Sequence, residues 1–288
     1  MQYHVNGDLV PADEATVSVR DRGFAYGDAA FETLRAYGGE VFEWPAHADR
    51  LQQTCKTLGF EDVVDRSDLH RRVTETLEAN DLAEAYVRLS VTRGVQPGKL
   101  TPQPAVDPTI VVVVAPLPRG GRDGRPPWDD PATVALAETR RVPDAAVPAA
   151  AKTHNYLNGI LARLELRGTT ADEALLVDGD GAIAEGATSN LFLVDDGTLK
   201  TPSLAGPVLP GVTRAVVLEL AREADIPVEE GTYRPAALRS ADELFLTNST
   251  WEIRPVGRYD GIPFEPGPVT GRLAERFETL VEERHYRS

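Results

Sequence analysis

The alternation of apolar and polar residues divides the chain into two sets of elements. In the first third, three short stretches rich in apolar residues predict strands, and apolar residues recur with a helical period in two others. Strands are expected at 30–37, 86–93 and 109–115, and helices at 45–58 and 67–80. This part of the chain is therefore predicted to be a sheet with two helices.

The pattern after residue 132 mixes the two periods. Strands are expected at 133–139, 173–177, 183–185, 190–194, 228–233, 243–247 and 253–256. Helices are expected at 155–167, 212–224, 235–239 and 270–285. Because these elements do not repeat as regular βαβ units, the pattern favours an α+β fold and argues against a doubly wound nucleotide-binding fold.

Local residues predict several boundaries. Asn6-Gly7 between Tyr3 and Val10 is typical of a type I′ hairpin turn. The glycine-punctuated segment 17–28 is predicted to be an irregular loop. Pro45 is expected to start the first helix and Ser67 to cap the second.

Residues 116–131 are rich in proline, glycine and arginine and have no apolar period. They predict an interdomain linker at 117–131, which separates a small α/β domain at 1–116 from a larger domain at 132–288. The alternative is a long loop within one domain. This alternative is less favourable, because structureless loops of this length are uncommon within a compact domain.

Charge and composition restrict the classes of partner. The 288 residues include 45 acidic and 30 basic ones, giving a formal net charge of −15, and only four of the basic residues are lysines. Such a surface repels nucleic acid and anionic membranes. It predicts adaptation to a salty cytoplasm, in which salt screens the self-repulsion; an acidic protein encoded by a GC-rich genome is the alternative.

The cysteine content and the length of the apolar runs argue against further classes of site and of protein. Cys55 is the single cysteine, so neither an intrachain disulfide nor a cysteine-rich metal site is expected. The N-terminus lacks the basic and apolar regions of a signal peptide, and the apolar run 110–115 is far too short to span a membrane. The expected location is the cytoplasm.

Lys152 is the first candidate for chemistry. It follows three alanines in a lysine-poor chain. A lysine desolvated in a pocket has a lowered pKa, and its neutral amine can attack a carbonyl and transfer protons. Tyr156 lies four residues later, so both would share one side of a helix beginning near Asn155. A surface lysine at a helix start is equally compatible with the spacing alone.

Three further segments, together with Arg50, carry polar groups that could bind a charged ligand. Glu185 lies in a glycine-flanked turn, where a buried carboxylate needs a cationic partner such as a protonated pyridine nitrogen. Segment 209–214 combines a glycine, free N–H groups and a hydroxyl at a helix start, which suits an anion. The turn 247–250 adds hydroxyls, and Arg50 a guanidinium. Taken singly, each is also an ordinary turn, cap or surface residue.

Five segments, taken in order, resemble the motifs of one family. They are Asp21-Arg22-Gly23-Phe24-x-Tyr26-Gly27-Asp28 with Phe31-Glu32-Thr33-Leu34-Arg35; His47-x-x-Arg50-Leu51; Lys152-x-x-Asn155-Tyr156-Leu157; Glu185-Gly186-x-x-Ser189-Asn190-Leu191-Phe192; and Leu209-Pro210-Gly211-x-Thr213-Arg214. The likeness to the class IV (fold-type IV) pyridoxal-phosphate enzymes covers nearly the whole chain.

The resemblance implies a fold and a set of roles. The fold would pair a small α/β domain with a larger, barrel-like domain of mixed sheet, with pyridoxal 5′-phosphate in the interdomain cleft. The catalytic lysine, which carries the cofactor as a Schiff base (the internal aldimine), would be Lys152. Glu185 would bind the pyridine nitrogen and Tyr156 the ring oxygen. The phosphate ligands would be Arg50, Gly211, Val212, Thr213 and Ser249, with Thr250 as a substitute because Asn248-Ser249-Thr250-Trp251 departs from the commoner Gly-Thr-Ala.

The resemblance leaves two reactions open. Tyr86-x-Arg88 is similar to the pair that branched-chain aminotransferases place at the substrate carboxylate, whereas Thr33 replaces their glycine and resembles the lyases of the family. Thr92-Arg93-Gly94 and Lys99 are also compatible with a dicarboxylate-like lyase substrate. Phe31, Thr33, Tyr86 and Arg88 are the predicted substrate residues.

The first choice is an aminotransferase, using a branched-chain or D-amino acid as donor and a 2-oxo acid as acceptor. The alternative is 4-amino-4-deoxychorismate lyase, which forms 4-aminobenzoate and pyruvate for folate synthesis. A cofactor-binding protein without turnover is a third reading. The resemblance also implies a homodimer.

Overall fold

The computed structural model describes residues 1–63, 65–119 and 128–287, which form two compact units. Unit 1 contains residues 1–119 together with 151–155, and unit 2 contains the described residues from 128 to 150 and from 156 to 287. The middle of the predicted linker 117–131, residues 120–127, lies outside the described residues.

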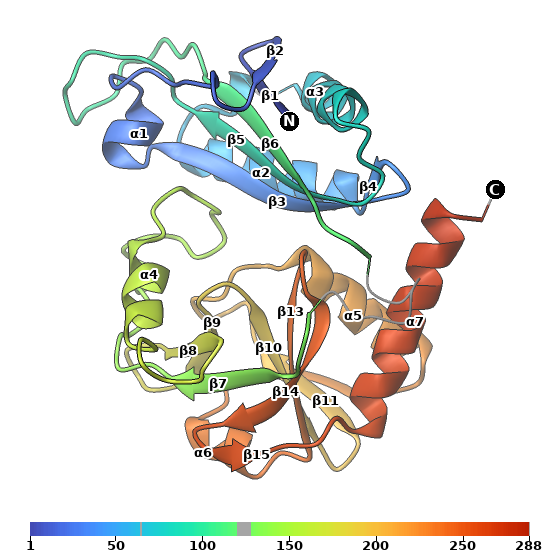
Figure 1. The fold of residues 1–288 in the computed structure, drawn as a ribbon. Helices are drawn as coiled ribbons and strands as arrows, with labels where there is room; N and C mark the ends of the chain where they lie inside the picture. Colours follow the sequence, from blue (N-terminus) through green and yellow to red (C-terminus); the bar gives the residue numbers. More distant parts are fainter. Residues whose placement is uncertain (64, 120–127, 288) are drawn as a thin grey trace. The chain divides into compact units, whose positions relative to one another are not determined.

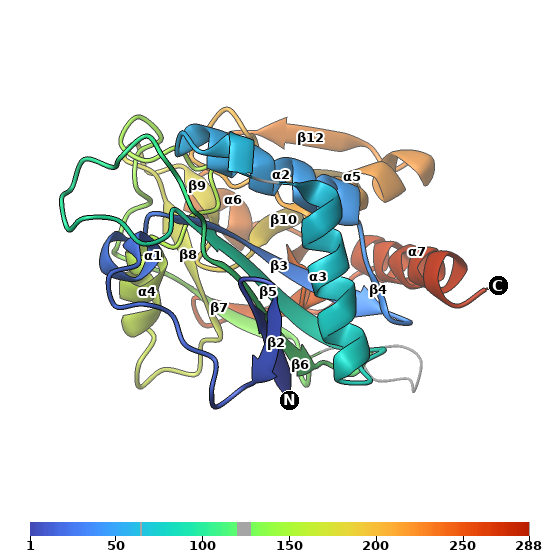
Figure 2. The ribbon, with the colours of Figure 1, turned by 90° about the horizontal axis from the view of Figure 1, so that it is seen from above.

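Unit 1 is an antiparallel sheet in the strand order β2-β1-β6-β5-β3-β4. The strands are β1 Gln2–Val5, β2 Asp8–Pro11, β3 Ala29–Tyr37, β4 Glu40–Val41, β5 Ala85–Thr92 and β6 Ile110–Pro116. Helices α2 (Trp44–Thr57) and α3 (Arg66–Ala79) cover one face, with a short 3-10 turn at Glu61–Val63 between them (Figures 1 and 2). Alternate residues of the strands, such as Ala30 and Leu34, pack with Leu51 and Val73 of the helices to form the core.

Local interactions explain where these elements begin. The Asn6-Gly7 hairpin is confirmed: Val5 pairs with Asp8, and both turn residues have positive φ. Ser67 as the cap of α3 is wrong, because the Asp65 side chain accepts hydrogen bonds from the N–H groups of Ser67 and Asp68.

The predicted irregular loop 17–28 contains a short helix, α1 (Arg22–Tyr26). Asp21 caps this helix, and Gly27 ends it in the left-handed conformation that favours glycine.

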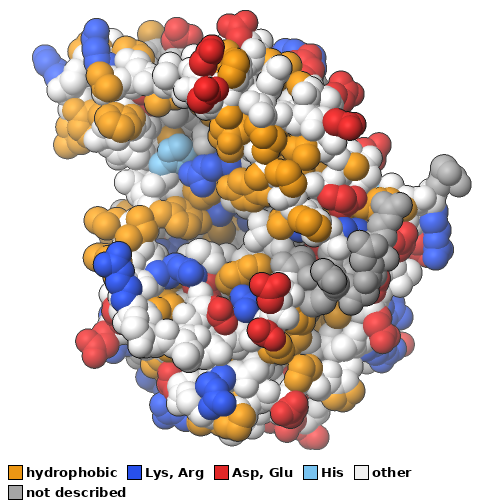
Figure 3. Space-filling model, in the orientation of Figure 1, with side chains coloured by type: hydrophobic (Ala, Val, Ile, Leu, Met, Phe, Trp, Pro, Cys, Tyr) orange, Lys and Arg blue, Asp and Glu red, His pale blue; other side chains and the backbone are white. Residues whose placement is uncertain are grey.

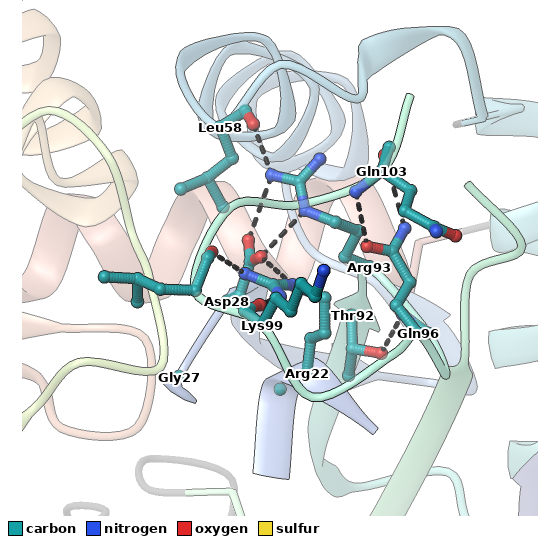
Figure 4. A network of polar contacts seen from close by, with 12 residues as sticks. Arg22, Gly27, Asp28, Leu58, Thr92, Arg93, Gln96, Lys99 and Gln103 are labelled. Carbon is teal, nitrogen blue, oxygen red and sulfur yellow. Dashed lines mark hydrogen bonds and ion pairs between the residues drawn. The ribbon is translucent and has the colours of Figure 1, made fainter. Parts of the chain in front are cut away.

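One carboxylate joins this short helix to the loop that follows β5. Asp28 accepts hydrogen bonds from Arg22 Nε at 2.7 Å and from Arg93 Nε at 2.7 Å (Figure 4). Arg22 also donates to the carbonyls of Lys99 and Leu100, so the segment before β3 holds the 93–100 loop in place. The pKa of Asp28 is lowered: burial alone would raise it, but the two guanidinium groups outweigh burial.

Unit 2 is a curled, mixed sheet in the order β12-β11-β10-β13-β14-β7-β8-β9, with β15 paired to β14. The strands are β7 Ala132–Leu136, β8 Glu173–Val177, β9 Ile183–Gly186, β10 Asn190–Asp195, β11 Thr198–Pro202, β12 Val228–Gly231, β13 Glu243–Asn248, β14 Glu252–Tyr259 and β15 Ile262–Pro263. The end strand β9 also lies against β10 and β11, and this contact curls the sheet.

Helices surround the sheet of unit 2 (Figure 1). They are α4 Leu157–Leu164, α5 Val212–Glu223, α6 Pro235–Arg239 and α7 Pro268–His285. Helices α5 and α7 pack together and against β13, whereas α4 packs on β8. A second core lies within the curl and includes Leu175, Leu191, Leu246 and Tyr259. None of the described helices is both long and apolar enough to cross a membrane.

Candidate active site

Lys152 lies in an extended segment and not at a helix start. Its carbonyl accepts a hydrogen bond from Phe31 N, and His154 N donates to Ala29 O, so residues 152–154 pair antiparallel with the edge of β3. The helix begins only at Leu157. The argument that Lys152 and Tyr156 share a helix face is therefore wrong: Lys152 belongs to unit 1 and Tyr156, the residue before α4, to unit 2.

The predicted substrate residues of unit 1 share one face of its sheet. Phe31 pairs with Ser90 and Thr33 with Arg88, and side chains directly opposite each other in an antiparallel pair lie on the same side. Tyr86 lies two residues before Arg88 and faces the same way. This is the face opposite to α2 and α3, because the intervening residues Ala30 and Leu34 are in the core.

Two cationic groups lie over the Phe31 ring. Lys152 Nζ is 4.4 Å and Arg88 Cζ 3.9 Å from the ring centroid. Such contacts stabilise cations that are partly removed from water. The structure thus brings together Lys152, Phe31 and Arg88, which are far apart in the sequence.

Arg50 is fixed by a buried carboxylate on β3. Its Nε and Nη2 donate to the two oxygens of Glu32 at 2.8 and 2.6 Å, and His47 Nδ1 lies 2.8 Å from Glu32 Oε2. Burial alone would raise the pKa of Glu32, but Arg50 and His47 lower it to about 2. Burial lowers the pKa of His47 despite Glu32, so at neutral pH the imidazole is uncharged and donates from Nδ1.

In unit 2, Glu185 is near the end of β9 and not in a turn. One carboxylate oxygen accepts from Arg141 Nε at 3.0 Å, and the other accepts from Leu209 N at 2.9 Å. Asn190 Nδ2 also approaches the second oxygen, at 3.4 Å, and donates to Leu209 O. Sequence reasoning missed Arg141, which lies eleven residues before Lys152 and had no motif of its own.

The N-terminus of α5 lies beside these groups and suits an anion. Gly211 is its N-cap in an extended conformation, and no side chain caps the helix. Among the described residues, the N–H groups of Val212 and Thr213 have no acceptor. A Cβ at residue 211 would overlap Asn190 Oδ1, so the close approach requires glycine. A phosphate would satisfy these donors.

Two hydroxyl groups in the turn after β13, those of Ser249 and Thr250, differ in their hydrogen bonds. Thr250 Oγ1 donates to Asn248 Oδ1 at 3.0 Å, and the same oxygen accepts from the N–H groups of Thr250 and Trp251. Ser249 makes no such bond within the part of the chain that the structure describes. Thr247 Oγ1 is buried and has no partner among the described residues. The geometry therefore favours Ser249 over Thr250 as an anion ligand.

A second buried carboxylate positions the Glu185 loop. Glu173, fully buried at the start of β8, accepts from Thr188 N at 3.1 Å, from Ser189 Oγ at 3.2 Å and from the Thr188 hydroxyl. The Asn248 side chain donates to Thr188 O, which links this loop to the turn after β13. The sequence marked Glu173 only as the first residue of a strand.

Arg93 is not available to a substrate. It is buried, pairs with Asp28 and also donates to Leu58 O. The Thr92 hydroxyl donates to Asp21, and Lys99 contributes its carbonyl to Arg22. These contacts hold the 93–100 loop, and a role of the Lys99 side chain at a dicarboxylate-like substrate stays a prediction.

Comparisons with known proteins identify the family of this chain. The family model described as amino-transferase class IV matches residues 29–259. A putative branched-chain-amino-acid aminotransferase of Methanocaldococcus jannaschii is 38% identical over 97% of this chain and 96% of its own length.

Solved structures share the fold. A branched-chain aminotransferase of T.th., complexed with N-(5′-phosphopyridoxyl)-L-glutamate, has a TM-score of 0.88 at 30% identity and covers 98% of this chain and 94% of its own. The 4-amino-4-deoxychorismate lyase of Pseudomonas aeruginosa has a TM-score of 0.84 at 32% identity, covering 96% of this chain and 98% of its own.

Proposed function

The chain belongs to the class IV aminotransferases, and from this we propose that it is a pyridoxal-phosphate enzyme that transfers an amino group from an amino acid to a 2-oxo acid. One observation carries the proposal: Lys152, in an extended segment on the edge of β3, places its Nζ 4.4 Å from the centroid of Phe31, whose ring also lies under Arg88. This arrangement puts an amine nucleophile next to an anion-binding guanidinium.

Pyridoxal phosphate, when bound, supplies an electron sink that makes the proton on the substrate's α-carbon acidic. Lys152 would hold the cofactor through its Nζ, and the amine of Lys152 would take and return this proton. Glu32 holds the Arg50 guanidinium, which would serve as a phosphate ligand.

Unit 2 is proposed to hold the ring nitrogen and the phosphate. The Glu185 carboxylate, which accepts from Arg141 Nε and from the Leu209 N–H, would bind a protonated ring nitrogen. Gly211, Val212 and Thr213 at the start of α5, with Ser249, would bind the phosphate. Tyr156 remains the proposed partner of the ring oxygen.

The substrate class is also part of the proposal. A branched-chain or D-amino acid is proposed as donor, and relatives named as branched-chain-amino-acid aminotransferases and as D-alanine aminotransferases support these two donors in turn. The lyase remains the second candidate because of Thr33, which faces Arg88 on the substrate side of the sheet, and the similarity to a lyase structure.

A donor screen distinguishes these reactions. With 2-oxoglutarate as acceptor and high KCl, L-leucine or L-valine is expected to give steady turnover, while D-alanine tests the other stereochemistry. The measurement is formation of glutamate and of the donor's oxo acid in equal amounts. Release of pyruvate from aminodeoxychorismate without any amino transfer would contradict the proposal and establish the lyase.

We propose that the stability of this acidic chain and its assembly into a dimer both depend on salt. Four large apolar side chains of α4 are 40–64% exposed: Leu157, Ile160, Leu161 and Leu164. Figure 3 shows apolar side chains gathered on the side of unit 2 where α4 lies. We infer that a second copy of this chain covers them, in a homodimer located in a salty cytoplasm.

Light scattering and thermal melting over a KCl series test this inference. Salt screens the repulsion of a −15 chain, so the dimer mass and a higher melting temperature are expected as KCl increases. A melting temperature that does not respond to KCl would contradict salt adaptation. A mass of one chain at every concentration would contradict the dimer.

A further inference from the structure

The extended segment 152–154 carries a second functional side chain, the imidazole of His154. Since side chains alternate along an extended segment, His154 faces the same way as Lys152, whereas Thr153 is buried opposite Ala30. Its ring reaches across β3, where it is paired with the small residue Ala29, to Ser90 on β5. The Nε2–Oγ distance is 3.1 Å.

His154 and Arg88 both contact the Phe31 ring. The imidazole meets it edge-on, with the centroids 5.5 Å apart, and the Arg88 guanidinium lies over it at 3.9 Å. A guanidinium stacked on a ring keeps its N–H groups in its own plane, directed away from the ring. Lys152 Nζ lies against the same ring, so under the proposed function the reacting carbon of a substrate would lie near this ring.

Arg88 lacks an anionic partner in the described part of the chain. Within the described residues, no carboxylate forms an ion pair with it and none of its five N–H groups donates to an acceptor, although the side chain is half-buried. A guanidinium partly removed from water needs an acceptor, and a carboxylate matches its paired donors.

His154 adds a donor without adding a third positive charge. Burial and then the Arg88 charge lower its pKa to about 4, against a smaller opposing effect of Asp21. The imidazole is therefore neutral at pH 7. If the Ser90 hydroxyl donates to Nε2, the proton of the ring is on Nδ1, which has no partner among the described residues.

We propose that His154 and Arg88 together bind the carboxylate next to the reacting carbon of the substrate, so that His154 is a specificity-determining residue for amino acids and 2-oxo acids. This inference rests on the proposed aminotransferase function and adds a residue to it. Ser90 holds the imidazole by its hydroxyl, and Phe31 supports both donors.

The test compares His154→Leu with His154→Gln in the cofactor-loaded enzyme. Isothermal titration with 4-methylvalerate, an unreactive monocarboxylate, measures binding without turnover. His154→Leu keeps an apolar side chain against Phe31 but has no donor, so its Kd is expected to rise about tenfold, equivalent to about 1.4 kcal/mol. His154→Gln has an amide N–H and is expected to remain within about threefold of the wild type.

Two results for the variants overturn the proposal. If His154→Leu binds as tightly as the wild type, or if both variants lose affinity equally, the imidazole only packs against Phe31. Lack of carboxylate binding by the wild type also overturns it. The cofactor absorption band and melting temperature of each variant show that the fold is intact. Failure of the proposed aminotransferase function can be told apart from failure of this inference, because it is measured by amino transfer in the wild type.

Discussion

Replacing Lys152 with alanine is expected to abolish amino transfer and the lysine–cofactor bond that borohydride makes permanent. Loss of the proton transfer alone should lower kcat by about 10²- to 10⁴-fold. The fold should survive, because residue 152 pairs with β3 through its backbone: its carbonyl accepts from Phe31 N and its N–H donates to Thr54 Oγ1 at 3.0 Å.

Borohydride reduction followed by peptide mass spectrometry measures the bond, and steady-state assays measure turnover. The chain has only three other lysines, Lys56, Lys99 and Lys200. Exposed Lys56 provides the matched control, and Lys56→Ala is expected to behave as the wild type. A cofactor-modified peptide from Lys152→Ala would show that another lysine carries the cofactor and would refute the assignment.

Replacing Glu32 with glutamine is expected to lower the free energy of unfolding by about 3–5 kcal/mol, because it removes one partner of a buried ion pair. The side chains of Glu32 and Arg50 are 1% and 9% exposed. The neutral amide leaves the Arg50 charge without its carboxylate and places an N–H where Arg50 and His47 both donate. Urea denaturation measures the loss, and hydrogen exchange in β3 and α2 locates it in unit 1.

The difference in stability between the wild type and Glu32→Gln is expected to depend on pH. The pKa of Glu32 is about 2 in the folded chain against 4.5 for an ordinary glutamate, a difference of roughly 3 kcal/mol. A lowered carboxyl pKa stabilises the fold above about pH 4.5, and this contribution disappears as the pH falls towards 2. The gap between wild type and Glu32→Gln should therefore be constant near neutrality and narrow below pH 4.5.

Glu14, an exposed residue of unit 1, supplies the control for the change in net charge. Glu14→Gln alters the charge equally and should shift stability by no more than about 0.5 kcal/mol. Equal effects of the two substitutions, or a gap that persists unchanged to pH 3, would mean that Glu32 does not hold Arg50 in the manner described.

Predictions from short-range signals largely agree with the structure. The Asn6-Gly7 hairpin, helix Pro235–Arg239 and the strand over Glu173–Val177 follow from turn chemistry, a proline at a helix start and a run of apolar residues. Each signal lies within the element that it specifies. The short helix α1 was missed because its cap and its glycine stop look like loop residues when no tertiary contact is known.

The error at Lys152 has a tertiary cause. Residues 152–156 are compatible with a helix start, but β4 pairs only with Ala36 and Tyr37 of β3. The edge of β3 near Phe31 therefore has backbone groups without a strand partner, and segment 152–154 satisfies them. Arg141, Glu173 and His154 were missed for a related reason, since each acts on a residue that is distant in sequence.

The sequence by itself determined the family and predicted both the cofactor-binding motifs and Lys152 as the reactive amine, because chemical type and motif order are local properties of the chain. The tertiary structure decided which groups meet. The alternation of β3 and β5 puts Phe31, Thr33 and Arg88 on one face, and edge pairing brings Lys152 and His154 to the same ring. Tertiary neighbours and burial decided the charges: Arg50 and His47 hold Glu32 ionised against the effect of burial, whereas burial and the Arg88 charge keep His154 neutral. Proximity and desolvation arise only when distant segments pack together, and no single segment encodes them.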